Sequence, residues 1–92
     1  MSERLNITAA EHIGSAWAPA AETILQLDSA DANAKVLVQA RVSAAAPWTT
    51  IGALAQFPSD LDRFVRLPRF PELRLVVVRN TAGSAVKVWD NE

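Results

Sequence analysis

The chain has 92 residues, of which half are hydrophobic, and its nine cationic and ten acidic side chains give a formal net charge of −1. This length supports a single domain over 1–92, and the near-neutral charge argues against a nucleic-acid partner or an anionic membrane surface. The sequence holds no cysteine, which excludes disulfides and thiolate metal sites. No stretch has the length of a secretory signal or a membrane span, so we expect no membrane partner.

The first third of the chain contains two weaker strand patterns. Alternation predicts short strands over 5–9 and 22–27, and residues 1–21 are a candidate N-terminal arm. In the second segment, Thr23, Leu25 and Leu27 fall on one face of the strand, and Ile24 and Gln26 fall on the other. The alanine-rich stretch 17–27 also has helical propensity, but Pro19 and a β-branched pair favour the strand.

The clearest alternation in the chain lies over 35–43. Apolar side chains fall on one face and mostly polar ones on the other, which is the period-two pattern of a half-buried strand. The inward set is Val36, Val38, Ala40 and Val42, and the outward set is Leu37, Gln39, Arg41 and Ser43. Weaker patterns predict strands over 48–54 and 63–67, with prolines marking the later connections.

Two further strands complete the chain. Over 73–80 both faces are apolar, so we expect a central strand that is covered on both sides. A turn follows at 80–84, where Asn80 and Gly83 both tolerate positive φ. It leads into a strand over 85–90, and we expect these last two strands to pair as a hairpin.

About seven short strands separated by turns define the expected fold class. It is all-β, a small antiparallel β-sandwich that could close like a barrel. The alternative is an α+β fold, because a single helical turn also fits 59–64.

No set of side chains in the sequence assembles a recognisable active site. His12 is the sole histidine, and no serine and acid accompany it in a nucleophilic pattern. Asp28, Asp31 and Asn33 lie within six residues, but their spacing is not that of a calcium loop, and a solvated turn fits them better. We therefore expect no enzyme activity, no cofactor and no metal ion.

The distribution of arginine points to protein contacts. Seven of the nine cationic residues are arginine, which is enriched at protein interfaces while lysine is depleted. Five of them fall within 63–79 beside one acid, giving this segment +5 − 1 = +4 and the rest of the chain +4 − 9 = −5. Such a stripe could track phosphates or meet acidic patches on a neighbouring subunit. The acidic remainder favours the neighbouring subunit over phosphates, and simple solvation of these charges is the third alternative.

Three tryptophans offer apolar contact area. Trp17, Trp48 and Trp89 could stack on sugar rings, but tryptophan more often fills a core or an interface. Trp89 is out of phase with Val86 and Val88, so we expect it to point away from the face that those valines bury. It is the first candidate for an aromatic side chain that contacts a partner.

Four segments carry a recognisable spacing: VLVQARVS at 36–43, APWTTIG at 46–52, FVRLP at 64–68 and LRLVVV at 73–78. They resemble small β-sandwich proteins encoded among the structural genes of tailed bacteriophages. In that family a strand of the form V-x-V-Q-x-S leads to W-x-x-I-G, then to an aromatic-proline stretch and a strand of the form x-R-x-x-V-x-N-x-x-G. The likeness covers 22–89, and this chain has alanines at 44–46 where the family has a Gly/Asp-rich turn.

The resemblance implies a virion structural accessory protein, made in the host cytoplasm. Its main form would be a capsid decoration or cement protein that stabilises the shell through repeated contacts with copies of itself and with the major capsid or another virion protein. A tail or fibre component is the alternative within the family, and a carbohydrate- or receptor-binding module is the alternative from another class. The expected contact residues are Trp89, Arg66, Arg69, Phe70 and Trp48.

Overall fold

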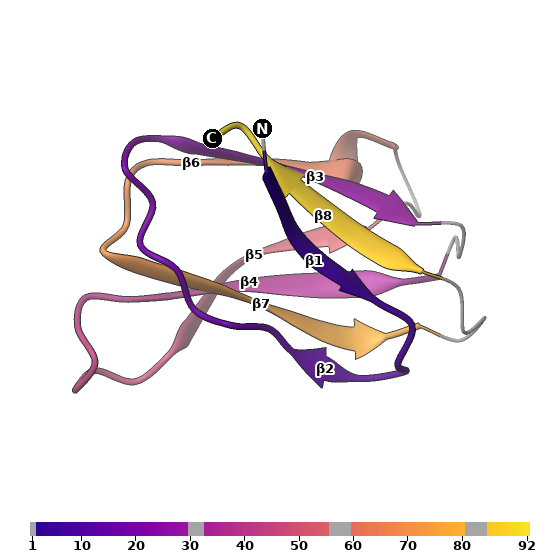
Figure 1. Ribbon diagram of the computed structural model, residues 1–92, viewed down its shortest axis with the longest axis horizontal. Coiled ribbons are helices and arrows are strands. Elements are labelled where there is room, and N and C mark those ends of the chain that lie inside the picture. Colours follow the sequence, from indigo (N-terminus) through magenta and orange to yellow (C-terminus); the bar gives the residue numbers. More distant parts are fainter. Residues whose placement is uncertain (1, 30–32, 56–59, 81–84) are drawn as a thin grey trace.

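The computed structural model describes residues 2–29, 33–55, 60–80 and 85–92, and within these ranges it is a two-layered β-protein (Figure 1). The strands are β1 (Ser2–Ile7), β2 (His12–Ile13), β3 (Thr23–Ser29), β4 (Lys35–Arg41), β5 (Thr49–Ala55), β6 (Phe64–Leu67), β7 (Glu72–Arg79) and β8 (Val86–Asp90). One 3-10 helix, η1 (Asp60–Arg63), precedes β6.

The strands form two antiparallel four-stranded sheets. Sheet A has the order β1-β8-β3-β6, and sheet B has the order β2-β7-β4-β5. The two sheets face each other across the core (Figure 1). This confirms the predicted all-β sandwich. The segment 17–27, which also had helical propensity, contains an isolated bridge at Trp17 and the start of β3.

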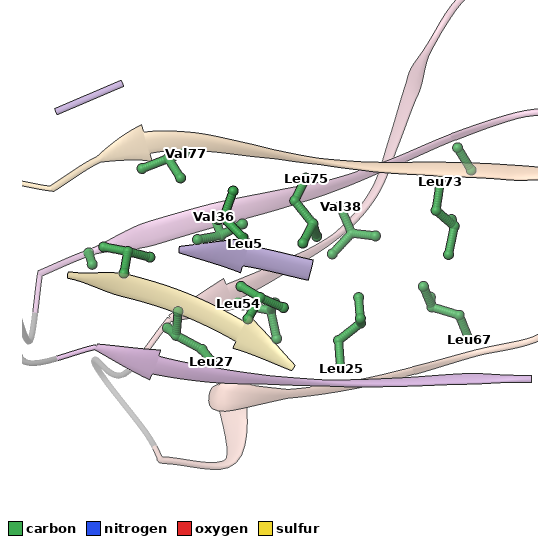
Figure 2. Close-up of a cluster of buried hydrophobic side chains, with 14 residues drawn as sticks. Leu5, Leu25, Leu27, Val36, Val38, Leu54, Leu67, Leu73, Leu75 and Val77 are labelled. Atoms are coloured by element: carbon green, nitrogen blue, oxygen red, sulfur yellow. The ribbon is translucent and has the colours of Figure 1, made fainter. Parts of the chain in front are cut away.

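Strict alternation of side chains explains why these strands stack. In β3 and β4 every second residue is buried, because successive side chains of a strand point to opposite faces. Figure 2 shows Leu73, Leu75 and Val77 of β7 directed toward Leu25 and Leu27 of β3. All five side chains are at most 1% exposed. The alternation predicted for 22–27 and the inward set predicted for 36–40 are confirmed.

The predicted hairpin between the last two strands is wrong. β7 pairs with β2 and β4 in sheet B, whereas β8 pairs with β1 and β3 in sheet A. Turn-forming residues between two strands do not say whether the chain returns within one sheet or crosses to the other. Here the two strands cover the same core from opposite sides, and 81–84 of the connecting turn lie outside the described residues.

Two finer predictions also need correction. β7 is central in sheet B, as expected, but its second face is not covered, because Val76 is half-buried and Val78 is 39% exposed. Val42 was expected in the core and is 73% exposed, since β4 ends at Arg41.

The N-terminal segment is held on both sheets. Within 1–21, the candidate arm, β1 pairs with β8 and β2 pairs with β7. Asp90 of β8 is buried, forms an ion pair with Arg4 and accepts the backbone N–H of Ser2 at 3.2 Å. These contacts hold the two ends of the chain side by side (Figure 1).

Candidate functional site

The outer face of sheet A carries a row of large side chains from three strands. The strand register places Trp89 of β8 opposite Gln26 of β3, and Gln26 opposite Phe64 of β6. Cross-strand neighbours share a face, so the two rings flank the amide at one strand spacing on each side, roughly 10 Å from ring to ring. Ile24 lies beside them. We call Ile24, Gln26, Phe64 and Trp89 the aromatic face.

The apolar part of the aromatic face is open to solvent. Ile24 is 40% exposed and Phe64 is 52% exposed, and Trp89 is half-buried. Shallow hollows of about 170 and 230 Å³ adjoin Trp89, and both are lined by Gln26. Within the described part of the chain, the Gln26 side chain makes no hydrogen bond. Its donors and acceptor are therefore available to a partner.

The charges around the aromatic face are balanced. Lys87, Arg63 and Arg66 are cationic, and Glu3, Asp28 and Glu22 are anionic. Arg66 holds Glu22 with two hydrogen bonds, of 2.9 and 3.3 Å. An apolar centre with a mixed polar rim is the usual composition of a protein–protein interface.

The outer face of sheet B uses its polar groups internally. Arg74 donates to Gln39 at 2.8 Å, and Gln39 donates in turn to Thr50 at 3.2 Å, so one chain of hydrogen bonds crosses β7, β4 and β5. Arg41 forms an ion pair with Glu72 at 2.8 Å. This side of the sandwich is therefore stabilised by its own network.

Trp48 is part of that network. The Arg41 guanidinium lies 4.2 Å from the centre of the Trp48 ring system, and the Arg74 guanidinium lies 4.6 Å from it. Both distances are within the range of cation–π attraction. An apolar hollow of about 280 Å³ adjoins Arg41, where Phe70 and Ile51 line the end of the sandwich.

An apolar row crosses the rest of sheet B's outer face. The register aligns Ile13, Val76, Leu37 and Ala53 across all four strands. Ile13 is 62% exposed at one edge, and Ala53 is exposed at the other. Val76 and Leu37 are half-buried between them.

The structure brings two of the five predicted contact residues together. Trp89 and Arg66 lie on the outer face of sheet A, and Trp89 points away from the buried valines, as the phase predicted. Phe70 packs half-buried against the core. Arg69 donates to the Pro19 carbonyl at 3.2 Å. Trp48 lies on the opposite side of the molecule, with sheet B.

The basic segment does not form one stripe. β6 and β7 belong to different sheets, so Arg66 and Arg74 face away from each other on opposite sides of the sandwich. Arg74 donates a hydrogen bond to Gln39, and Arg79 donates one to the Asn33 carbonyl at 2.7 Å. The spacing of these arginines in the sequence predicted one continuous basic surface. The strand order instead distributes them over the two sheets.

The remaining candidates stay apart. His12 is exposed on β2, and Asp28 belongs to β3, while Asp31 lies outside the described residues. Among the described residues, no three His, Cys, Asp or Glu side chains gather as a set that could hold a metal ion. That part of the chain also contains no helix with the length and hydropathy needed to cross a membrane.

Three members of the aromatic face were not named from the sequence. Ile24, Gln26 and Phe64 were recognised as strand residues, but nothing in the sequence showed that β3 lies between β6 and β8. The available signal was Ile24, an isoleucine on the face opposite Leu25 and Leu27 of its predicted strand, and a phenylalanine within the strand predicted over 63–67. An apolar outward residue on a predicted strand is the pattern that could have marked this face.

Comparison with known proteins gave no match: no family model matches the chain, and no match was found among curated proteins or solved structures.

Proposed function

We propose that the chain is a structural subunit that assembles with other protein subunits through the aromatic face of sheet A. The observation that carries the proposal is the cluster of Ile24, Phe64 and Trp89 on the outer face of sheet A. Large apolar side chains gathered at one exposed place mark interaction sites more often than isolated ones do. Trp89 has the chemistry of an interface anchor.

The mixed charges around the aromatic face are compatible with a second copy of the chain as one such neighbour. A two-fold contact brings the same patch of both copies together, so a patch with charges of one sign would repel itself. The aromatic face has three cations and three acids around its apolar centre, and a face-to-face contact can place unlike charges opposite each other.

The particular form of this function rests on the family resemblance. A virion accessory protein, above all a capsid decoration protein, would use the aromatic face to bind a copy of itself or the shell. Many weak contacts of this kind, repeated by symmetry, attach a small subunit firmly. The proposal assigns the chain to the virion and gives it no catalytic step.

Light scattering over a range of chain concentrations tests the proposal. We expect a molar mass above that of one chain, reduced for Trp89→Ala and for Ile24→Lys, because each removes apolar contact or places a charge in it. Ile13→Lys, on the other sheet, is the matched control and should leave this contact intact. Unchanged circular dichroism with unchanged mass for both aromatic-face variants would contradict the proposal.

A carbohydrate- or receptor-binding module is the second candidate, and one observation favours it. The unpaired Gln26 amide lies between two aromatic rings, where it could hydrogen-bond sugar hydroxyls while the rings cover the apolar side of the sugar. A glycan array probed with the wild-type chain separates the two functions. Binding that disappears with Trp89→Ala would support the carbohydrate module.

A further inference from the structure

Residues 2–20 connect the edges of the two sheets, and we call them the strap. Within the strap, β1 pairs with β8 of sheet A, and β2 pairs with β7 of sheet B. Beyond β2, the backbone N–H groups of Gly14 and Trp17 donate to the carbonyls of Leu75 and Leu73, at 2.8 and 2.9 Å. Without the strap, β8 and β7 would therefore be edge strands (Figure 1).

The strap contributes few side chains to the core. Only Leu5 and Pro19 of its residues are buried, whereas β3 and β4 each bury every second side chain. Ile7 and Trp17 pack against the core but are only partly buried. Segments with few buried apolar contacts open in native proteins at a lower free energy than that of global unfolding. The core between the two sheets therefore depends little on the strap.

Both ends of the strap are held by the same two carboxylates. Near its start, Arg4 forms ion pairs with Asp90 and Glu92, and the Ser2 N–H donates to Asp90 at 3.2 Å. At its end, the Ala20 N–H donates to Glu92 at 2.7 Å. The side chain of Asp90 is fully buried, and a buried charge is stable only while it keeps its partners. Neither end can leave the sandwich without breaking contacts to these carboxylates.

The parts of the strap also contact one another. The Arg4 guanidinium lies 5.0 Å from the centre of the Trp17 ring system, within the range of cation–π attraction, so the two ends meet. A Cβ at Gly14 would lie 3.5 Å from the Leu5 side chain and 3.1 Å from the carbonyl oxygen of Leu75. Glycine therefore lets the stretch after β2 approach both β7 and the apolar side chain of β1.

We propose that the strap opens and closes on the sandwich as one unit, with Asp90 and Glu92 as its lock. The residue between them holds the start of β3 instead. The Asn91 side chain accepts the Ile24 N–H at 2.9 Å and donates to the Glu22 carbonyl at 3.2 Å. Neighbouring residues therefore fix the strap and β3 separately, so β3 stays in place when the strap opens. This motion does not require assembly through the aromatic face.

Native-state amide hydrogen exchange tests whether the strap is one unit. We expect Gly14 and Trp17 to share one protection factor, at least about tenfold lower than that of Val38 in β4, between two neighbouring strands. Their exchange should also depend less on urea, because strap opening exposes less surface than unfolding. Equal protection at all three amides would mean that the strap leaves only by global unfolding. Different protection at Gly14 and Trp17 would mean that its parts open separately, and either result would overturn the proposal.

Glu92→Ala tests the lock. It removes the acceptor of the Ala20 N–H and one partner of Arg4, so protection at Gly14 and Trp17 should fall together by roughly tenfold. Gly14 makes its hydrogen bond to β7, so a fall there shows that the whole strap responds. A fall at Trp17 without one at Gly14, or no fall at either amide, would overturn the lock.

Asn91→Ala is the matched control at the neighbouring position. It also removes two hydrogen bonds to the backbone, but both bonds remain when the strap opens. Protection at Gly14 should therefore stay as in the wild type, while protection at Val38 should fall because global unfolding does break these bonds. A fall at Gly14 as large as that in Glu92→Ala would show that Glu92 has no specific hold on the strap, and would overturn the proposal.

Discussion

The two outer faces of the sandwich carry similar residues, but these residues make different contacts on each face. Each carries a half-buried tryptophan, a glutamine and an arginine–glutamate pair. In sheet B, Gln39 links Arg74 to Thr50, and two guanidinium groups lie on Trp48. In sheet A, Gln26 has no side-chain partner in the described chain, and none of the cation–π contacts of that part of the chain involves Trp89.

The difference shows why composition alone does not locate a binding surface. A tryptophan whose ring is stacked on its own arginines contributes mainly to folding, because a partner would first have to displace them. A tryptophan between open hollows costs little to cover, since no internal contact is lost. Availability to a partner depends on whether neighbouring strands already satisfy the side chain.

The largest effect we expect is on stability at Trp48. Trp48→Ala removes half-buried ring area and two cation–π contacts, so the free energy of unfolding should fall by about 2–3 kcal/mol. Trp89→Ala should cost about 1 kcal/mol, because it loses area without those contacts. Urea unfolding at a concentration where both variants are monomeric measures the difference.

An equal loss of unfolding free energy in Trp48→Ala and Trp89→Ala would contradict the inferred difference between the two faces. A larger cost at Trp89 would mean that it acts in folding, and the aromatic face would lose its anchor. The m-value should stay unchanged in both variants, which checks that the denatured state has not altered.

The two arginine–glutamate pairs give a smaller, matched effect. Arg41 and Glu72 are 21% and 27% exposed in their side chains, whereas Arg66 and Glu22 are 74% and 48% exposed. We expect Arg41→Ala to cost about 1–1.5 kcal/mol, because it also uncovers Trp48. Arg66→Ala should cost less than about 0.5 kcal/mol, since an exposed pair is screened by water and salt.

Tryptophan fluorescence sharpens this measurement. The emission of the folded Arg41→Ala variant should change because the environment of Trp48 changes, and Arg66→Ala should leave it as in the wild type. A double-mutant cycle with Glu72→Ala separates the ion pair from the stacking. If Arg66→Ala lowered the free energy of unfolding more than Arg41→Ala, the side chains on the outer face of sheet A would contribute more to stability than those on sheet B.

Strand identity and phase were predictable from the sequence, but strand partners were not. The alternation in 35–43 fixed which side of β4 faces the core, since side-chain direction repeats every two residues. The aromatic face, however, combines Gln26, Phe64 and Trp89 from strands that are distant in sequence. Their meeting depends on strand order, which alternation does not encode. The same gap led to the wrong hairpin between β7 and β8.

The role of Trp48 was beyond the sequence for a related reason. Its stacking partners come from β4 and β7, and they reach it because these strands are neighbours in sheet B. Five arginines within seventeen residues looked like one surface, yet the chain crosses between sheets inside that segment. Local spacing describes a surface well only while the chain stays in one sheet.

The smallest effect on stability that we expect is at the two glutamines. Substitution of Gln26 also distinguishes the two candidate functions. Gln39→Leu leaves Arg74 without its acceptor and should cost about 0.5–1.5 kcal/mol, whereas Gln26→Leu should change stability by less than about 0.5 kcal/mol. In the assembly function, Gln26→Leu enlarges the apolar centre, so the molar mass should be kept or raised. In a carbohydrate module the same substitution removes the amide between the rings and should abolish glycan binding. A loss of assembly with Gln26→Leu would show that the amide, rather than the apolar cluster, holds the partner.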